Sequence, residues 1–369
     1  MRINIMDVGL KMVPGHFFEY DRALAKGLSQ LGHEVRVYGY VGMTDDAEKK
    51  LQTYGKVGKI FRADQFEQAS TKDAYAGEFL IYADQTQTLL EDLKQAEEAD
   101  LWIWPSMLAQ QLNACAQFGG SATVIGCIHD DPGIAQRTAE AMLWRHALVE
   151  ARRRGLKYTV GSIESEIRHQ FMSIVPDGRF ALFPKPHDGP SIPEAKTNLS
   201  RIGFLGDMRG EKGRDLLGQL VSRLIGEGYE ITIQDSVGRV KISEHPKVEL
   251  LGHIENMRDA IARCDLVVLP YDVDRYRRKG SGILADCMVA GVPVVGPYAT
   301  MPGRTIEQWG VGLLFGNSTH AEIFAVIKHA HQNYPQLAEA AFRAAPRFAR
   351  QNGTDKFVSA MLQLAPEGP

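Results

Sequence analysis

The chain has 369 residues, of which 44% are hydrophobic and 24% charged, and its formal net charge is −3. This length suits two domains with separate cores, and this composition excludes an intrinsically disordered protein. The small net charge excludes a general nucleic-acid-binding protein, which would carry a large basic excess, so any anion site must be local.

The first elements follow the order strand, loop, helix, strand. Residues 2–8 read as an apolar strand, 9–15 as a loop, and the next residues as a long helix with apolar side chains at helical spacing. A second strand follows at 34–40. This order is typical of nucleotide-binding folds. Gly15 and His16 lie where the loop meets the helix, so we expect them at the carboxyl edge of the sheet, as a helix cap or as ligand contacts.

The middle of the first half alternates helices and strands. We predict helices at 45–54 and 84–97, and strands at 59–62, 101–104 and 122–128. Such alternation predicts a parallel sheet covered on both faces. His129 follows the last of these strands directly, and strand ends of this kind hold the ligand-binding residues of open α/β sheets. In the alternative, Asp130 or Asp131 caps the next helix and His129 is only its neighbour.

A long helix then ends in three arginines, Arg152 to Arg154. Cations at a helix end complement the helix dipole, and contact with an anionic membrane surface is the alternative. Strands at 158–161 and 180–183, with a helix at 164–172 between them, complete this half. The run 187–200 has two prolines and no periodicity, so we interpret it as the linker.

The second half restarts with a strand at 201–205, the glycine-rich turn 206–213 and a helix that ends near 226. The first amides of a helix have no intrahelical partner and carry about half a positive charge, which stabilises an anion. Arg209 and Lys212 add side-chain charge on this turn. We therefore predict an anion site here.

The same pattern returns later in the chain. A buried strand at 266–269 leads into a basic loop at 271–279, the Gly280-Ser281-Gly282 turn, a short helix ending at Gly291 and a strand that begins at Pro293. The basic side chains of the loop are Arg275, Arg277, Arg278 and Lys279. We interpret this stretch as a diphosphate cradle; the alternative is a solvent-exposed basic loop before an ordinary helix. Asp272 and Asp274 are expected to form surface ion pairs with these cations, in preference to a metal site.

The remaining residues add little chemistry. The four cysteines are scattered singly without metal or disulfide spacing, so we expect buried, reduced thiols and no nucleophile. Helices from 319 to the end carry apolar side chains, and the last is expected to cross back onto the first domain. No segment reaches the ~20 apolar residues that span a bilayer, and no signal peptide is recognised, so we expect a cytoplasmic protein.

The turn 204–213 and the 278–286 segment resemble those of GT-B retaining glycosyltransferases of the family 4 type, the glycosyl transferases group 1. In that family a basic pair, an arginine and a lysine, holds the donor diphosphate, and Lys212 falls on the lysine of this pair. Asp207, which follows Gly206, stands at the position of the arginine. Arg209 supplies the positive charge that the arginine would carry. Asp286 matches the second of two glutamates, which grips the nucleotide ribose. Arg278 replaces the first, which is associated with the transferred sugar.

Further segments carry the same resemblance. Gly280, Ser281 and Gly282 match the backbone that meets the diphosphate, and Gly252-His253-Ile254 resembles the segment that receives the base through backbone groups. Gly15 matches a loop that approaches the donor. His129 matches a histidine that the family often places near the reacting sugar.

The resemblance implies two Rossmann-like α/β domains that face each other across a cleft. Residues 1–188 would form an acceptor-side domain, joined by 350–369, and residues 200–349 would bind the nucleotide sugar. The absence of Gly-x-Gly-x-x-Gly after the first strand argues against a nicotinamide dehydrogenase.

The implied activity is that of a retaining, hexosyl-type glycosyltransferase. It would move a sugar from a UDP- or GDP-sugar to a glycan, a lipid-linked or a small-molecule acceptor, with His129, Lys212 and Arg209 as catalytic residues. We expect no metal, no further cofactor and no nucleic-acid partner, and peripheral contact with the inner face of the membrane stays open. A degenerate protein that only binds a nucleotide or a partner, and a sugar-nucleotide epimerase, are the alternatives.

Overall fold

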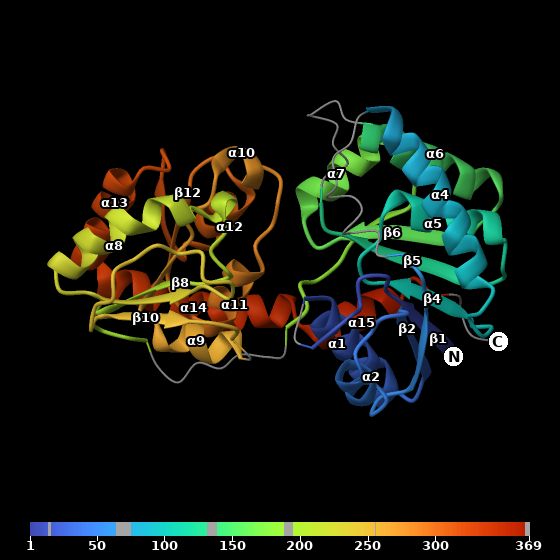
Figure 1. Ribbon diagram of the computed structural model, residues 1–369, viewed down its shortest axis with the longest axis horizontal. Helices are drawn as coiled ribbons and strands as arrows, with labels where there is room; N and C mark the ends of the chain where they lie inside the picture. Colours follow the sequence, from blue (N-terminus) through green and yellow to red (C-terminus); the bar gives the residue numbers. More distant parts are fainter. Residues whose placement is uncertain (14–15, 64–74, 131–138, 188–194, 255, 366–369) are drawn as a thin grey trace. The chain divides into compact units, whose positions relative to one another are not determined.

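The computed structural model describes residues 1–13, 16–63, 75–130, 139–187, 195–254 and 256–365. The chain divides into two compact units, one formed by Met1–Pro186 with Thr354–Pro369 and the other by His187–Gly353. Each unit is built on a parallel sheet with helices on both faces (Figure 1). The predicted α/β class with two Rossmann-like domains is confirmed.

The first unit contains a seven-stranded parallel sheet in the order β3-β2-β1-β4-β5-β6-β7. Its strands are β1 (Arg2–Met6), β2 (Glu34–Tyr40), β3 (Lys56–Phe61), β4 (Leu101–Trp104), β5 (Thr123–Ile128), β6 (Tyr158–Ser162) and β7 (Phe180–Leu182). The helices described in this unit are α1 (His16–Gln30), α2 (Asp45–Leu51), α4 (Tyr75–Leu93), α5 (Ala109–Phe118), α6 (Ala139–Arg153), α7 (Ser165–Ile174) and α15 (Thr354–Leu362). The strand order reverses between β1 and β4, which places a topological switch point there.

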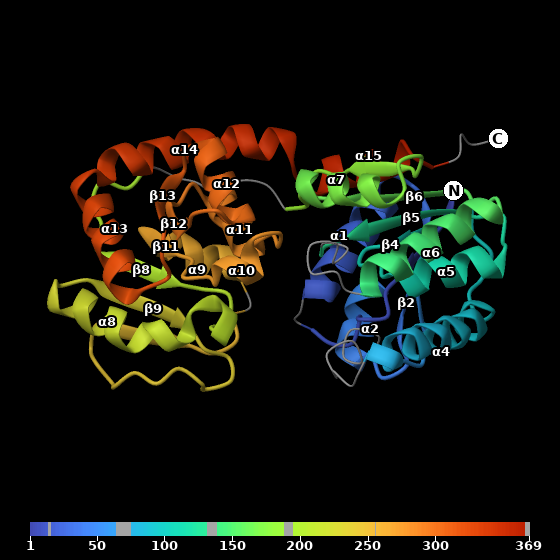
Figure 2. The same cartoon turned by 90° about the horizontal axis from the view of Figure 1, so that it is seen from above.

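Helix α15 belongs to the first unit although it comes last in the chain. Its buried side chains, Phe357, Val358 and Met361, share a core with α1, α2 and one face of the sheet. Helices α4, α5 and α6 pack against one another as a second layer, and Figure 2 shows this layer and α15 on different sides of the strands. The return of the last helix to the first unit agrees with the sequence-based expectation.

The second unit contains a six-stranded parallel sheet in the order β10-β9-β8-β11-β12-β13. Its strands are β8 (Arg201–Phe204), β9 (Glu230–Gln234), β10 (Val248–Leu251), β11 (Leu266–Val268), β12 (Val294–Pro297) and β13 (Gly312–Phe315). Its described helices are η2 (Gly210–Lys212), η3 (Arg214–Leu216), α8 (Leu217–Gly226), α9 (Met257–Arg263), α10 (Val273–Tyr276), α11 (Gly282–Ala290), α12 (Met301–Trp309), α13 (His320–Gln332) and α14 (Tyr334–Gln351). Here the order reverses between β8 and β11.

Two apolar layers hold this sheet. Helices α9, α11 and α14 bury side chains against one face, and α8 and α13 cover the other. Helix α11 is apolar nearly all round, and Leu284, Cys287, Met288 and Val289 are each 2% exposed or less. A helix of this kind must be enclosed, so its start is fixed relative to the strands.

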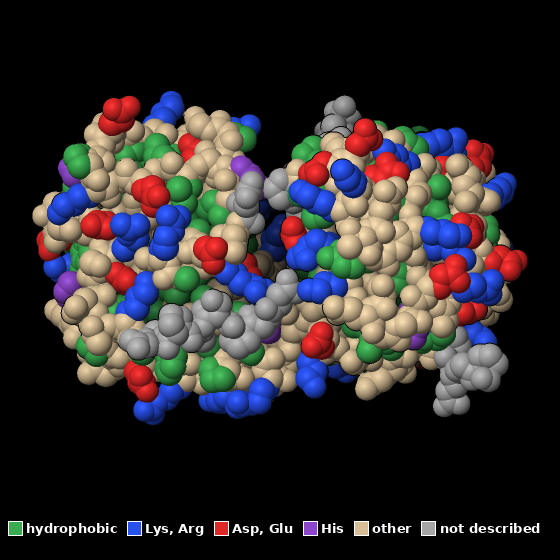
Figure 3. Space-filling view, turned by 90° about the horizontal axis from the view of Figure 1, so that it is seen from below, with side chains coloured by type: hydrophobic (Ala, Val, Ile, Leu, Met, Phe, Trp, Pro, Cys, Tyr) green, Lys and Arg blue, Asp and Glu red, His purple; other side chains and the backbone are tan. Residues whose placement is uncertain are grey.

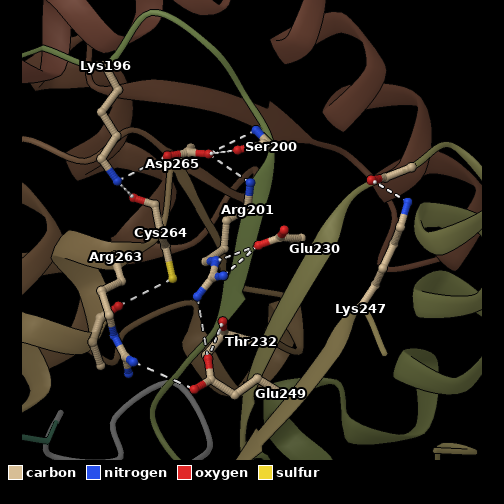
Figure 4. A network of polar contacts seen from close by, with 12 residues as sticks. Lys196, Ser200, Arg201, Glu230, Thr232, Lys247, Glu249, Arg263, Cys264 and Asp265 are labelled. Atoms are coloured by element: carbon tan, nitrogen blue, oxygen red, sulfur yellow. Dashed lines mark hydrogen bonds and ion pairs between the residues drawn. The ribbon is translucent and has the colours of Figure 1, made fainter. Parts of the chain in front are cut away.

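At the amino edge of this sheet, Asp265 is the centre of a network of hydrogen bonds and an ion pair (Figure 4). Its Oδ2 accepts hydrogen bonds from the amides of Ser200 and Arg201, at 2.9 and 2.7 Å, and from the Ser200 hydroxyl, at 2.8 Å. The Lys196 ammonium lies 3.0 Å from Oδ1. Burial alone would raise the pKa of Asp265, but these hydrogen bonds outweigh it and lower that pKa. The network fastens the segment before β8 to the strand β11.

Two predicted elements are wrong in detail. Helix α4 begins at Tyr75, well before the predicted start at residue 84, because Phe79 and Leu80 face solvent and give no apolar period there. The loop 271–279 contains the short helix α10, capped by Asp272, whose Oδ1 accepts the Arg275 amide at 2.8 Å.

The charged surface is mixed in sign. Basic and acidic side chains alternate over the face drawn in Figure 3. The arginines at the end of α6 are used locally, since Arg152 contacts Asp177 while Arg153 and Arg154 contact Glu150. No helix in the described ranges is long and apolar enough to cross a membrane.

Candidate functional site

The candidate site lies at the carboxyl edge of the six-stranded sheet, where β8 is flanked by β9 and β11. The turn after β8 and the loop after β11 meet there. The Asp272 amide donates to the Glu211 carbonyl at 2.9 Å. Gly213 has a φ of +78°, and a side chain on it would collide with the Pro270 carbonyl, so only glycine permits this approach. The site therefore forms at the switch point, where open α/β sheets bind ligands.

The turn after β8 is held by a residue that sequence reasoning missed. The buried Gln234, the last residue of β9, accepts through Oε1 from the amides of Gly206 and Asp207 at 2.7 and 2.9 Å. Asp207 has a φ of +50°, and its Oδ1 accepts the Ser236 amide at 3.1 Å. Asp207 thus shapes the turn, and its carboxylate holds the loop that follows β9.

Lys212 is half-buried on this turn and donates from Nζ to the Gly206 carbonyl. Its pKa is lowered to about 8, mainly by burial and also by the nearby Arg209 and Lys279, while Asp207 and Glu211 oppose the shift. Among the described residues, no carboxylate lies within ion-pair distance of Nζ. A cation that is partly desolvated and lacks a counter-ion is favourably placed to bind an anion.

The start of α11 supplies amide donors beside this lysine. Ser281 caps the helix, since its Oγ accepts the Leu284 amide at 3.2 Å and lies 3.1 Å from the Tyr271 hydroxyl. The amides of Gly282 and Ile283, as the first two of the helix, have no intrahelical acceptor. A side chain at Gly282 would meet open space. A methyl group at Gly206 would lie 2.6 Å from Cγ1 of Ile283, so the two turns touch.

The remaining cations of the site differ in how they are paired. Arg209 is half exposed, and its Nε lies 2.9 Å from the Glu211 carboxylate. Arg277 pairs with Asp274 at 2.8 Å, as expected for surface ion pairs. Arg278 is half-buried, and none of the hydrogen bonds or ion pairs found among the described residues involves its side chain. The cradle therefore contains more positive charge than its own carboxylates neutralise.

Asp286 lies one turn into α11. Burial raises the pKa of its carboxyl group to about 6, and Arg258 only partly opposes this. No hydrogen bond to the Asp286 carboxylate is found within the described part of the chain. His253 and Ile254 follow the carboxyl end of β10; His253 is exposed and Ile254 packs against the core around α9 and α11. Asp286 thus offers an acceptor carboxylate, and His253 is an exposed residue at the end of β10.

The residues predicted in the first unit are only partly described. His129 is half-buried at the end of β5, and its Nε2 lies 2.8 Å from the Pro105 carbonyl. Because a carbonyl can only accept, Nε2 carries the proton. The ring meets Tyr20 edge-on, with 5.4 Å between centroids. Gly15 lies outside the described residues, and His16 is the first residue of α1.

The four cysteines offer no nucleophilic centre. All four cysteines are buried and free, and burial raises the pKa of Cys115, Cys127 and Cys264 to about 12. Thiols of this kind are poor nucleophiles. Within the described ranges, no three His, Cys, Asp or Glu side chains are grouped to hold a metal ion.

Residues 200–333 match the family model described as glycosyl transferases group 1. Within this segment the chain is similar to the glycosyl transferases of group 1. The matched range covers both turns of the candidate site and excludes the first unit. No curated protein sequence was found to match the chain.

Solved glycosyltransferase structures resemble the whole chain. HepE from Anabaena, in a complex with UDP and glucose, aligns with a TM-score of 0.69 at 15% identity and covers 98% of each chain. Sucrose-phosphate synthase from Thermosynechococcus elongatus aligns with a TM-score of 0.71 at 12% identity, over 99% of this chain and 98% of its own. A glycosyltransferase from Rickettsia africae gives 0.68 at 12%, with 99% and 98% coverage. At these identities the likeness shows a shared fold, the two-domain GT-B fold.

Proposed function

We propose that the protein is a retaining glycosyltransferase that moves a sugar from UDP-sugar to a glycan, lipid-linked or small-molecule acceptor, without a metal ion. The observation that carries this proposal is Lys212, a half-buried cation that has no counter-ion among the described residues and contacts the glycine turn, which itself touches Ile283 at the start of α11. The UDP and UDP-glucose complexes of HepE support UDP over GDP as the leaving group.

In this proposal the chain acts mainly by stabilising charge. The bond between the anomeric carbon and the β-phosphate oxygen breaks, and negative charge grows on that oxygen. Lys212, Arg209 and the amides of Gly282 and Ile283 are fixed donors for that charge. The acceptor oxygen bonds to the anomeric carbon on the face from which UDP leaves, and its proton passes to the released phosphate. Fixed cations would thus take the place of a divalent metal ion.

The proposed ligand contacts extend from these donors. Asp286 would accept the ribose hydroxyls, and the backbone at His253 and Ile254 would receive the base. Gly206 and Gly280 would line the diphosphate with Ser281. We keep Gly15, His16 and His129 as proposed donor contacts, and the Pro105 carbonyl holds His129 in one tautomer.

Lys212→Ala tests this proposal. We expect turnover to fall by about 10² to 10³, the loss typical of one transition-state donor, while Lys247→Ala, an exposed lysine of the same unit, stays near the wild type. In the unsubstituted protein, kcat/KM should decline as the pH passes about 8, because Lys212 then loses its proton. Normal turnover in purified Lys212→Ala would contradict the assignment.

The alternatives predict different products. A protein that only binds nucleotides would bind a UDP-sugar without releasing UDP. An epimerase would convert the UDP-sugar in the absence of any acceptor. Slow release of UDP by hydrolysis, accelerated by an acceptor, is the result that supports a transferase.

A further inference from the structure

A hollow outside the cradle lies between the start of α8 and the loop that follows β9. Its volume is about 590 Å³, within the roughly 300–1,000 Å³ that is typical of small-molecule sites. Three cations and one carboxylate line it together with two glycines: Arg214, Asp215, Gly218, Gly238, Arg239 and Lys241. None of these residues belongs to the proposed donor site. The hollow is therefore a separate place where a ligand could bind.

The loop side of the hollow is held in shape by Asp235. Its Oδ1 accepts the Arg239 amide at 3.0 Å, and its Oδ2 accepts the Val240 amide at 2.7 Å. Burial alone would raise the pKa of Asp235, but hydrogen bonds from these amides outweigh it and lower that pKa. Gly238 has a φ of +66°, which the turn requires and glycine permits. The backbone that carries Arg239 is therefore fixed.

The other side of the hollow is formed by η3 and the first turn of α8. Arg214 is half-buried, and its Nε lies 3.2 Å from the Asp215 carboxylate. A side chain on Gly218 would place its Cβ 3.7 Å from the Lys241 carbonyl oxygen, so the loop after β9 reaches the helix at this point. Cations from two separate segments of the chain are thus brought to one hollow.

The positive charges of the hollow outnumber its negative charge. Arg239 and Lys241 are exposed, and no ion pair or hydrogen bond of their side chains is found among the described residues. Asp215 is the carboxylate among the lining residues, and its side chain is 78% exposed. Three cations against one carboxylate leave an excess of two positive charges. A concave surface with this excess attracts an anion.

The number and type of these cations match a phosphate group. A phosphate monoester carries a charge of about −1.5 to −2 on three acceptor oxygens, whereas a carboxylate carries one charge on two oxygens. Arginine binds phosphate with two parallel hydrogen bonds, and lysine adds a point charge. A long polyanion such as nucleic acid fits less well, because the exposed Asp215 and Glu244 flank the cations along the chain. We propose that this hollow is a second anion site, which binds a phosphate monoester.

Titration of the full chain with phosphate at constant ionic strength tests this proposal, with UDP present to fill the cradle. The NMR amide signals of Gly218 and Gly238 report the hollow, and that of Gly282 reports the cradle. Inorganic phosphate and glycerol 3-phosphate, a small monoester, should each shift the first two signals in a saturable way and leave Gly282 unchanged. If UDP itself does not bind, the proposed function fails, and the same titration of Lys212→Ala still tests the hollow.

Three variants give the site a direction of effect. Arg239→Gln should weaken phosphate binding at least about tenfold, because a charged hydrogen-bond donor is lost. Asp215→Asn should tighten it about two- to fivefold, because the repulsion between its carboxylate and the phosphate is removed. Arg343→Gln is the matched control. It removes an exposed arginine of α14 that pairs with Glu339, and it should bind phosphate as the wild type does.

Several outcomes would overturn the site. These are the lack of a saturable shift at Gly218 and Gly238, equal phosphate binding in Arg239→Gln and the wild type, or an equal loss in Arg343→Gln, which would show only an effect of net charge. Tighter binding of a single-stranded oligonucleotide than of glycerol 3-phosphate would assign the surface to nucleic acid instead.

Vesicles distinguish the two sources of a phosphate monoester, a soluble molecule and a lipid headgroup. Cosedimentation with phosphatidylcholine vesicles that contain phosphatidic acid, lost without this lipid and in Arg239→Gln, would identify a headgroup. Saturation by glycerol 3-phosphate without cosedimentation would identify a soluble ligand. Either result supports a phosphate monoester site in this hollow.

Discussion

At the amino edge of the six-stranded sheet, the buried Asp265 is surrounded by donors, whereas near the carboxyl edge Asp286 has no donor among the described residues. The same contrast holds for cations. Lys196 lies 3.0 Å from a carboxylate oxygen, whereas the acceptor found for Lys212 among the described residues is the Gly206 carbonyl. Burial acts on both carboxyl groups, yet the pKa of Asp265 is lowered and that of Asp286 is raised to about 6.

The difference shows how one sheet separates stability from binding. Charges at the amino edge are satisfied by the chain itself and hold its segments together. Charges at the carboxyl edge are left with unmet hydrogen-bonding capacity, which lowers stability and favours a ligand. Removal of a buried carboxylate charge at the two edges should therefore have opposite signs in stability.

The largest effect is expected for Asp265→Ala. Loss of this carboxylate leaves the amides of Ser200 and Arg201 and the Lys196 ammonium without their acceptor, so we expect a loss of about 3 to 5 kcal/mol. Hydrogen exchange of the β8 and β11 amides measures it within the second unit. Asp274→Ala, whose side chain is 88% exposed, should change stability by less than about 0.5 kcal/mol. An equal loss of stability in Asp265→Ala and Asp274→Ala would show that the Asp265 network does not stabilise the second unit.

Asp286→Asn should stabilise the protein near pH 7. Between its ordinary pKa of 3.8 and about 6, the folded chain holds a proton that the unfolded chain has released, so the ionised Asp286 costs stability as the pH rises through this window. We expect the amide to recover up to about 2 to 3 kcal/mol at pH 7.

Urea unfolding at several pH values between 4 and 7 checks this, because the difference between Asp286→Asn and the wild type should vanish at the acid end. Asp265 has the opposite pH dependence. Its pKa is lowered in the folded chain, so its ionised carboxylate stabilises the fold, and this stability is lost as the pH falls through the lowered pKa. UDP should also bind more weakly to Asp286→Asn. A variant that is less stable than the wild type at pH 7 would show that Asp286 is a structural residue.

The smallest effect is expected for Gln234→Ala. The amides of Gly206 and Asp207 then lose their acceptor, which should cost about 1 to 2 kcal/mol and also weaken UDP binding because the turn loosens. Thr232→Val, on the same strand, removes one hydrogen bond to Glu249 and leaves the turn intact. Calorimetric titration should find reduced UDP affinity only in Gln234→Ala. Unchanged UDP affinity in this variant would show that the turn after β8 does not form part of the UDP site.

Much of the fold was predictable because its signals are local. The strand at 101–104 lies where its four apolar residues predicted it. The helix after Ser281 begins at this N-cap residue and ends at Gly291, a glycine with positive φ. The resemblance in the 200s and 280s also marked the segment that the family model matches.

What the sequence could not predict depends on contacts between distant residues. Gln234 is 28 positions from the turn that it holds, and nothing in its neighbourhood marks it as different from other strand-end glutamines. Helix α10 is only four residues long and lies within a basic run, so periodicity could not reveal it. Arg278 and Arg277 are adjacent and alike in type; only burial and partners distinguish them.

The position of α15 has a consequence for biosynthesis. The second unit is inserted between β7 and the final helix of the first unit, so the ribosome completes the second unit before it releases residues 354–365. Until then the first unit is incomplete, because the apolar surface that later contacts Phe357 and Met361 is exposed. The second unit, although it is synthesised later, is already complete. Nascent chains stalled before residue 354 would therefore expose the first unit to chaperones and proteases.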